Sequence, residues 1–309
     1  MSDDGADEAR ALLALGLELQ AAGYRFTTVT PATHARINAR PANAEARDLA
    51  GVFGWSRPFR RALLPSQLSA LLAEAGALVD AGGGLSRSAV RFSSLGERLY
   101  VHSAFPTDAA DAVFFGPDTY RFVAALSRRA RPAKLAVDLG CGSGAGGLSL
   151  DGRVERLILT DINPRALRLA RVNAALAGAA GVDFALGDLY AAVDGDVDLV
   201  VANPPYIADL AGRAYRDGGG AVGTGLSRRI VAEGLPRLRR GGQLILYTGA
   251  PVRDGEDLLR QELTPLVDPA AYHMEYEELD PDVFGEELEQ PSYADIDRIA
   301  VVCLEITRG

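Results

Sequence analysis

Short apolar runs alternate with amphipathic segments from Pro132 to the end of the chain. Apolar runs of about four to eight residues are typical of buried parallel strands, and the segments of helical period between them are typical of connecting helices. We therefore expect an α/β fold with a mostly parallel sheet. The predicted strands are 134–138, 156–161, 182–186, 197–202, 243–248, 271–277 and 298–306, and the predicted helices are 164–177, 227–239 and 256–262.

The first part of the chain has a different pattern. Helices are predicted over 6–22, 44–53, 65–75 and 120–129, and a hairpin is predicted from 89–92 and 98–102. Helices followed by a small hairpin indicate a winged-helix-like module. We therefore predict two domains: residues 1–115 as a helical and hairpin domain for substrate recognition or a lid, and residues 116–309 as the α/β domain.

Charge and composition limit the partners. The net charge is −9 and the pI about 5.0, whereas proteins that cover long nucleic-acid surfaces usually carry a basic footprint. The one basic and aromatic cluster in the first domain is interpreted as a solvated helix end or a phosphate site; it consists of Trp55, Arg57, Arg60 and Arg61. We therefore favour a lid or accessory role for this domain over nucleic-acid contact.

The chain shows no sign of export or membrane insertion. No stretch approaches the roughly 18 consecutive apolar residues of a membrane-spanning helix, and the acidic start lacks the features of a signal peptide. Cys141 and Cys303 are too few for a disulfide framework. We therefore expect a cytoplasmic protein, with no membrane partner and no metal site.

A glycine-rich turn follows the first predicted strand of the α/β domain. Asp138 ends this strand, and Gly140, Gly142 and Gly144 come next. Glycine lets the backbone approach a ligand closely because it has no Cβ and tolerates positive φ. An acid two residues before the first glycine suits a ligand with an ammonium group and would repel a pyrophosphate. This favours S-adenosylmethionine, although Ala145 could complete a dinucleotide pattern and keeps that alternative open.

The next two strands also end in acids. Asp161 follows the second strand about 20 residues after the glycines, where a carboxylate can accept ribose hydroxyls, and Ile162 comes next. Asp188 ends the third strand and can accept from the adenine amino group, while Leu189 can cover the ring. We predict these four residues as cofactor contacts. Asp161 as a helix N-cap and Asp188 as a turn residue remain the structural alternatives.

The fourth strand ends at Asn203-Pro204-Pro205-Tyr206. The prolines remove N–H donors and lead the chain out of the sheet along a rigid path. The Asn203 Oδ1 and the Pro204 carbonyl can accept both N–H bonds of an amide or exocyclic amine, whose lone pair is otherwise delocalised, and Tyr206 can stack on the flat group. We predict Asn203, Pro204 and Tyr206 as catalytic, with Asn203 also near the cofactor. No general base is needed, so His34, His102 and His273 are predicted to be structural.

Taken together, these motifs resemble the class I S-adenosylmethionine-dependent methyltransferases. Residues 134–263 are most similar to the N-P-P-Y group, which includes release-factor glutamine methyltransferases and small-domain ribosomal RNA guanine methyltransferases. The resemblance implies a seven-stranded Rossmann-like sheet with a C-terminal antiparallel hairpin, and a segment over 115–119 that closes over the cofactor. The loop over 215–220 departs from the glutamine enzymes, so the resemblance does not assign the substrate.

An acidic segment lies between Asp268 and Asp297, with eleven acidic residues and no Lys or Arg. If the strand near Tyr272 is parallel to the others, the loop after it emerges on the cofactor side of the sheet. A solvated loop is the simpler interpretation. The sharper hypothesis is a surface that repels phosphate and receives a cationic protein or peptide, with Glu286, Glu287 and Glu289 as its test residues.

The sequence thus predicts an N-methyltransferase with a protein or peptide side chain as substrate. Two alternatives remain. One keeps the enzyme but makes RNA the substrate, and the other is a catalytically silent protein that binds the cofactor or acts as a scaffold.

Overall fold

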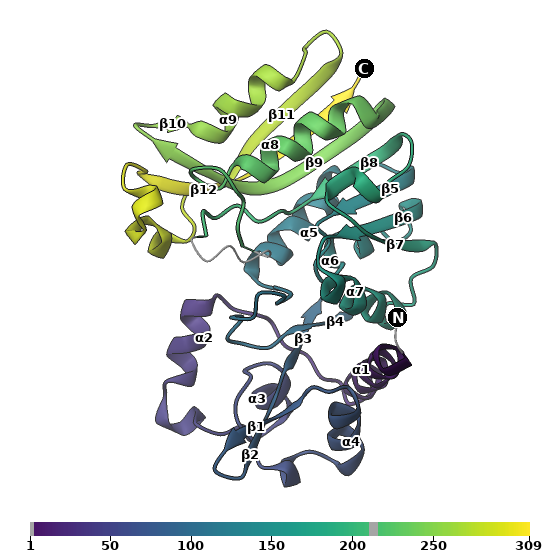
Figure 1. Ribbon diagram of the computed structural model, residues 1–309, viewed down its shortest axis with the longest axis vertical. Helices are drawn as coiled ribbons and strands as arrows, with labels where there is room; N and C mark the ends of the chain where they lie inside the picture. Colours follow the sequence, from purple (N-terminus) through teal and green to yellow (C-terminus); the bar gives the residue numbers. More distant parts are fainter. Residues whose placement is uncertain (1–2, 210–215) are drawn as a thin grey trace. The chain divides into compact units, whose positions relative to one another are not determined.

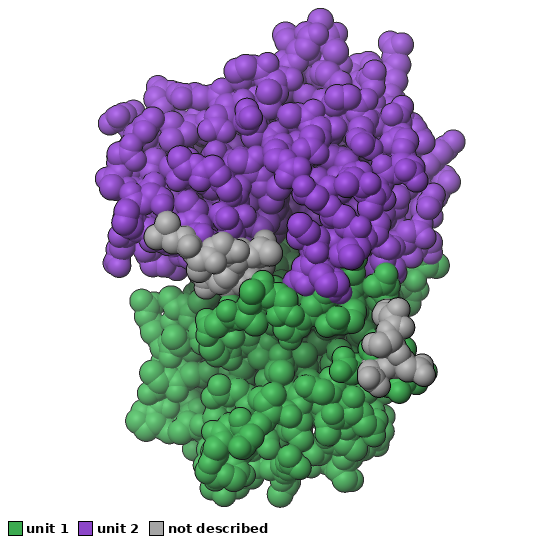
Figure 2. Space-filling view, in the orientation of Figure 1, with its two compact units in different colours: residues 1–120, 142–145, 165–180 green, residues 121–141, 146–164, 181–309 purple. Residues whose placement is uncertain are grey.

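The computed structural model describes residues 3–209 and 216–309. Its contacts divide the chain into two compact units, coloured separately in Figure 2. Unit 1 contains residues 1–120, 142–145 and 165–180, and unit 2 contains residues 121–141, 146–164 and 181–309. This division differs from a single cut at residue 115, because two later segments of the chain pack within unit 1.

Unit 2 contains the expected α/β sheet (Figure 1). In the described residues its strand order is β11-β12-β9-β8-β5-β6-β7, and the two-residue β10 (Glu256–Asp257) pairs with β9. Strands β7 to β9 are parallel to their neighbours on this path, and β12 is antiparallel to both β9 and β11. The bounds are β5 (Ala133–Leu139), β6 (Val154–Asp161), β7 (Val182–Leu186), β8 (Val197–Ala202), β9 (Leu238–Arg253), β11 (Tyr272–Asp280) and β12 (Arg298–Arg308). The predicted sheet and C-terminal antiparallel hairpin are confirmed.

Helices cover both faces of this sheet. On one face, Ile230 of α8 (Gly225–Gly234) and Leu259 of α9 (Leu258–Leu263) join a core cluster with Val200 and Leu244 of the strands. On the other face, the Phe122 ring of α5 (Pro117–Arg129) lies 5.9 Å from that of Tyr247. No helix in the described parts of the chain is long and apolar enough to cross a membrane.

The helix predicted over 227–239 is shorter than expected. It ends at Gly234 and continues as a 3-10 turn, Leu235–Arg237, before β9 begins at Leu238. Pro236 lies in that turn, where its ring prevents further α-helical hydrogen bonding. The strand predicted over 243–248 therefore extends at both ends.

Unit 1 contains the predicted hairpin, in which β3 (Val90–Leu95) pairs antiparallel with β4 (Arg98–Ser103). A second hairpin, β1 (Leu78–Gly82) with β2 (Leu85–Ser88), was not predicted. The helices are α1 (Asp3–Ala21), α2 (Pro31–Asn38), α3 (Leu49–Phe53) and α4 (Ser66–Glu74). The helix predicted over 44–53 is thus only α3, and α2 was missed although Thr30 caps it with Pro at its first position.

Helix α7 (Pro164–Leu176) follows β6 in the sequence, but most of it belongs to unit 1. Leu176 lies against α1, where a Cβ added at Gly16 would come within 2.7 Å of its Cδ2. Asn173 is fully buried, and its side-chain amide bonds to both backbone groups of Val101 and to the Ser143 carbonyl. These contacts explain why the unit boundary does not follow the order of the chain.

Candidate active site

The predicted functional residues of unit 2 gather where the strand order reverses. Strand β5 is parallel to β6 on one side and to β8 on the other, with Leu139 opposite both Thr160 and Ala202. The carboxyl ends of these strands therefore bring Asp161 and Asn203 to either side of the β5 turn. In open α/β sheets, ligands bind in the crevice at this switch point.

Asp138 is buried at the end of β5, with 2% of its surface exposed. Its Oδ2 accepts a hydrogen bond of 2.7 Å from the Gly147 N–H, near the start of α6 (Ala145–Leu148), and its Oδ1 accepts none from the described residues. Burial raises the pKa of Asp138 to about 7, and the nearby charge of Asp161 acts in the same direction. The carboxyl group therefore lacks a cationic partner within unit 2.

The three glycines after β5 all have left-handed backbones. The φ angles are 64° at Gly140, 53° at Gly142 and 79° at Gly144. A Cβ at Gly140 or Gly142 would meet nothing within 4 Å, so the backbone conformation, and not a lack of space, requires glycine there. Gly140 belongs to unit 2, whereas Gly142 and Gly144 belong to unit 1.

An apolar surface lies beside Asp161. Ile162 is 62% exposed, and Leu186, which pairs with Asp161 across β6 and β7, is 59% exposed. The Asp161 Oδ1 accepts from the Asn163 N–H at 2.8 Å, which is the turn-forming bond of the structural alternative. Exposed aliphatic side chains beside a carboxylate suit a nucleoside, which presents a flat ring and hydroxyl groups. Leu186 was not predicted from the sequence.

Asp188 is exposed and carries an unpredicted partner. Arg229 of α8 donates to both carboxylate oxygens of Asp188, at 3.0 and 3.4 Å. Leu189 has a φ of 49°, rare for a side chain of this size, and is only 7% exposed because it packs in the core of unit 2. The contact of these two residues with a cofactor stays a prediction.

Asn203 is the first residue after β8, and its side chain is half-buried. Within residues 3–209 and 216–309, its amide makes no hydrogen bond. Pro204 is buried directly after it. An amide at the end of a central strand, with both its oxygen and its nitrogen unengaged, is available to bind an incoming polar group.

The ring of Tyr206 is held against unit 2. It lies over Gly249 of β9, where an added Cβ would come within 2.2 Å of the ring. On its other side, the Phe284 ring lies 6.0 Å away at 58°. Phe284 has a left-handed backbone, with φ at 55°, which is unusual for an aromatic residue and often marks functional sites. Phe284 was missed because the sequence gives no sign that the β11–β12 loop returns to Tyr206.

Backbone contacts hold the segment that follows Tyr206. Ile207 bridges to Asp217, and the Tyr293 hydroxyl accepts from the Ala208 N–H at 2.8 Å. A Cβ at Gly223 would lie 2.2 Å from the Tyr206 carbonyl oxygen. The glycine-rich loop is therefore packed directly on the N-P-P-Y segment. Of the departure noted over 215–220, residue 215 lies outside the described residues.

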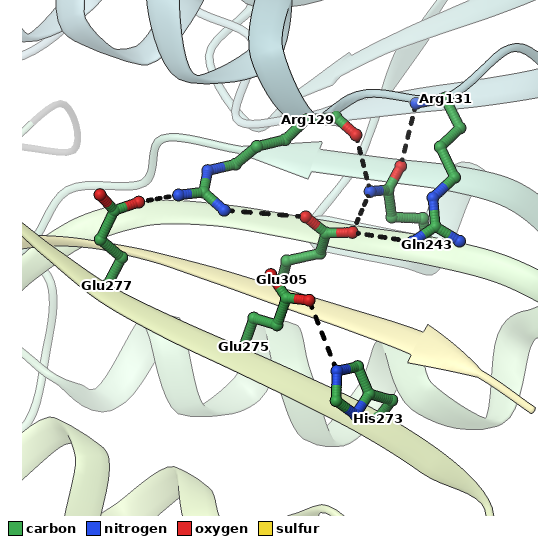
Figure 3. A network of polar contacts seen from close by, with 7 residues as sticks. All are labelled: Arg129, Arg131, Gln243, His273, Glu275, Glu277 and Glu305. Carbon is green, nitrogen blue, oxygen red and sulfur yellow. Dashed lines mark hydrogen bonds and ion pairs between the residues drawn. The ribbon is translucent and has the colours of Figure 1, made fainter.

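The acidic segment is mostly neutralised by cations of unit 2. Strand β11 runs in the same direction as β9, so its loop does emerge at the carboxyl edge of the sheet. Figure 3 shows Arg129 between Glu277 and Glu305. Ion pairs link the acids to neighbouring cations: Glu275 to His273, Glu278 to Arg298, Asp280 to Arg121, Glu287 to Arg216 and Asp295 to Arg253. Glu287 is buried in its pair, so counting it with Glu286 and Glu289 as an accessible acidic surface was wrong.

The three histidines take no part in this site. His34 and His102 are buried in unit 1, where burial lowers the pKa of each, to about 4 for His34. His273 is exposed on β11 beside Glu275. Their placement agrees with the predicted structural roles.

We expect Gly249→Ala to displace the Tyr206 ring, because the added methyl has no space beside it. Overpacking of this kind costs about 1–3 kcal/mol, and catalysis should fall further because Tyr206 moves. Gly285→Ala is the matched control, since a Cβ there meets nothing within 4 Å and its φ is not positive. Urea unfolding and methyl-transfer rates of the two variants check this; equal behaviour would show that the Tyr206 position is not constrained by Gly249.

Comparison with known proteins places the central part of the chain. Residues 117–264 match the family model of the methyltransferase small domain. A release factor glutamine methyltransferase of Deinococcus radiodurans is 38% identical over 134 residues, which is 39% of this chain and 47% of the relative. One from Cereibacter sphaeroides is 34% identical over 173 residues, 50% of this chain and 60% of the relative. A ribosomal RNA small subunit methyltransferase C of Actinobacillus pleuropneumoniae is 34% identical over 118 residues, 37% of this chain and 32% of the relative.

The chain spans about half the length of the glutamine methyltransferases that it matches. Among solved structures, Trm5b from Pyrococcus abyssi has a TM-score of 0.52 at 14% identity, covering 80% of this chain and 71% of that one. Methanocaldococcus jannaschii Trm5 in complex with adenosine has a TM-score of 0.50 at 15% identity, covering 72% and 56%. The structures support the fold, and the family model and relatives confirm the predicted S-adenosylmethionine-dependent methyltransferase family.

Proposed function

We propose that this chain, whose residues 117–264 belong to the class I S-adenosylmethionine-dependent methyltransferases, methylates a planar nitrogen on a protein or peptide side chain. The observation that carries this proposal is the unengaged Asn203 amide at the end of β8, followed by the buried Pro204 and the fixed ring of Tyr206. The curated relatives include enzymes named for glutamine in release factors and for ribosomal RNA. Both names are consistent with nitrogen as the methyl acceptor.

The residues at the switch point suit S-adenosylmethionine. The buried Asp138 carboxyl lacks a cationic partner within unit 2 and could bind an ammonium group, Asp161 could accept from ribose hydroxyls, and Ile162 offers an exposed apolar surface to adenine. When bound, this cofactor supplies an electrophilic methyl group on sulfur. The protein's part is to hold the acceptor nitrogen in line with that methyl.

Asn203 and Pro204 would bind the acceptor. The Asn203 Oδ1 and the Pro204 carbonyl accept the two N–H bonds, which favours a tetrahedral nitrogen with a localised lone pair. The nitrogen becomes acidic once it is methylated, so its proton passes to water without a strong general base. Tyr206, fixed between Gly249 and Phe284, is proposed to border the flat acceptor group.

The same site could act on RNA, and one relative's name favours that alternative. The basic and aromatic cluster of unit 1 does not strengthen it, because its cations have partners within the unit. Arg57 bonds to Asn38 and lies over Trp55, Arg60 pairs with Glu45, and Arg61 bonds to Ser86. These contacts favour a structural role for the cluster.

A labelling experiment separates the alternatives. The protein is incubated with methyl-labelled S-adenosylmethionine and fractionated lysate, with and without nuclease, and Asn203→Ala serves as the inactive control. We expect label in a protease-sensitive, nuclease-resistant fraction. Label lost with nuclease would transfer the proposal to RNA, and equal label with Asn203→Ala would contradict the role of this residue. A chain that binds cofactor but labels nothing would support the scaffold alternative.

A further inference from the structure

Arg91 on β3 is a buried cation without a counter-charge. It is 4% exposed, and no acidic side chain of the described residues pairs with it. Its Nη2 donates a long hydrogen bond of 3.4 Å to the Thr28 Oγ1, and its Nε has no partner. The guanidinium lies 5.6 Å from the centre of the Phe26 ring. Burial lowers the pKa of Arg91 only to about 10, so the group is charged at neutral pH.

The hydroxyl groups beside Arg91 are already committed to one another. The His102 Nδ1 lies 3.0 Å from the Ser103 carbonyl oxygen, which can only accept, so Nδ1 carries the proton. Nε2 must then accept from the Ser93 hydroxyl at 2.7 Å. Ser93 in turn accepts from Thr28, and Thr28 accepts from Arg91. The chain ends in a neutral imidazole, so it provides no negative charge for the guanidinium.

Arg91 lines a small hollow of unit 1. Thr28, His102 and Ser103 line it with Arg91, while Phe105 and Phe115 are among its apolar walls. Its volume is about 10 Å³, which suits one particle of roughly the size of a water molecule. The hollow therefore combines a positive charge, an unspent N–H donor and a narrow size limit.

We propose that this hollow binds a compact monovalent anion, chloride or a single small carboxylate, which accepts from the Arg91 Nε and neutralises its charge. A buried ion without a partner is costly, whereas an anion in contact with it offsets much of that cost. The apolar walls would exclude larger or strongly hydrated anions. The site belongs to unit 1 alone and does not depend on the proposed methyl transfer.

The test measures thermal stability as chloride replaces gluconate at constant ionic strength, with formate in a parallel series. Gluconate is too large for the hollow, so the first series begins without a ligand. We expect a saturable rise in Tm of about 5 °C at a chloride concentration a hundredfold above the dissociation constant. A rise with formate alone would assign the site to carboxylates, and a rise with chloride alone would assign it to halides.

Two variants make the assignment specific. Arg91→Met removes the charge at similar volume and should abolish the anion response. Arg25→Met is the matched control, since Arg25 is an exposed arginine of the same unit that pairs with Glu97 at 2.9 Å, and it should retain the response. The chloride-35 line width of the unmodified protein gives a second measurement, in case Arg91→Met does not fold. No saturable shift together with no line broadening would overturn the proposal and leave water as the occupant.

Discussion

Asn203→Ala is expected to lower kcat for methyl transfer by about a hundredfold to a thousandfold, which is the usual effect of removing one group that stabilises the transition state. The Asn203 amide has no other hydrogen-bond partner in the described residues, so its loss should not destabilise the fold. Single-turnover rates with labelled cofactor measure the effect. The free energy of unfolding and the cofactor Kd serve as controls.

The pattern of constants is as informative as the size of the loss. If Asn203 acts mainly in the transition state, kcat and kcat/KM should fall together while the cofactor Kd changes by less than about tenfold. A rise in the cofactor Kd that accounts for the whole loss would make Asn203 a cofactor-binding residue alone. Unchanged turnover would remove it from the mechanism.

Asp138→Asn is expected to weaken cofactor binding and to remove its dependence on pH. Because burial raises the pKa of Asp138 from 3.8 to about 7, the carboxyl must lose a proton before it can bind an ammonium group. Cofactor affinity of the unmodified protein should therefore rise by about tenfold from pH 6 to pH 8. Calorimetric titrations at several pH values check this, with the exposed Asp194→Asn as the matched control.

The same substitution should stabilise the protein without cofactor at high pH. The folded-state pKa of Asp138 lies above that of the unfolded chain, so the folded protein binds the proton more tightly. Its contribution to stability is therefore complete below about pH 4 and is lost as the pH rises through 7. Since Asn keeps an oxygen for the Gly147 N–H, we expect Asp138→Asn to gain about 2–4 kcal/mol at pH 8. Equal stability of the two proteins across this range would mean that Asp138 is not strained by burial.

The order of the motifs along the chain predicted much of the site. Asp138, Asp161 and Asn203 each follow a short apolar run, and parallel strands bring their carboxyl ends to one edge. Strands β7 and β8 and the first residue of α7 were predicted at their observed positions. These features depend on local periodicity and on proline, which act within a few residues.

The partners of the predicted residues could not be found in this way. Arg229 lies 41 residues from Asp188, and Phe284 reaches Tyr206 from a loop between two later strands. The acidic segment illustrates the difference most clearly. Its sequence suggests an exposed negative surface, but folding brings arginines from four other segments to its carboxylates.

The sequence by itself determined the parallel sheet, the glycine turn after Asp138 and the N-P-P-Y segment, because each is fixed by local backbone preferences and short-range patterns. Only the tertiary structure decided that Asp138 is buried without a cation, that Gly249 and Phe284 hold Tyr206, and that Arg91 has no counter-charge. These properties depend on desolvation and on contacts between residues distant in the chain. Neither is encoded in the spacing of residues, because both arise only when the strands and helices pack.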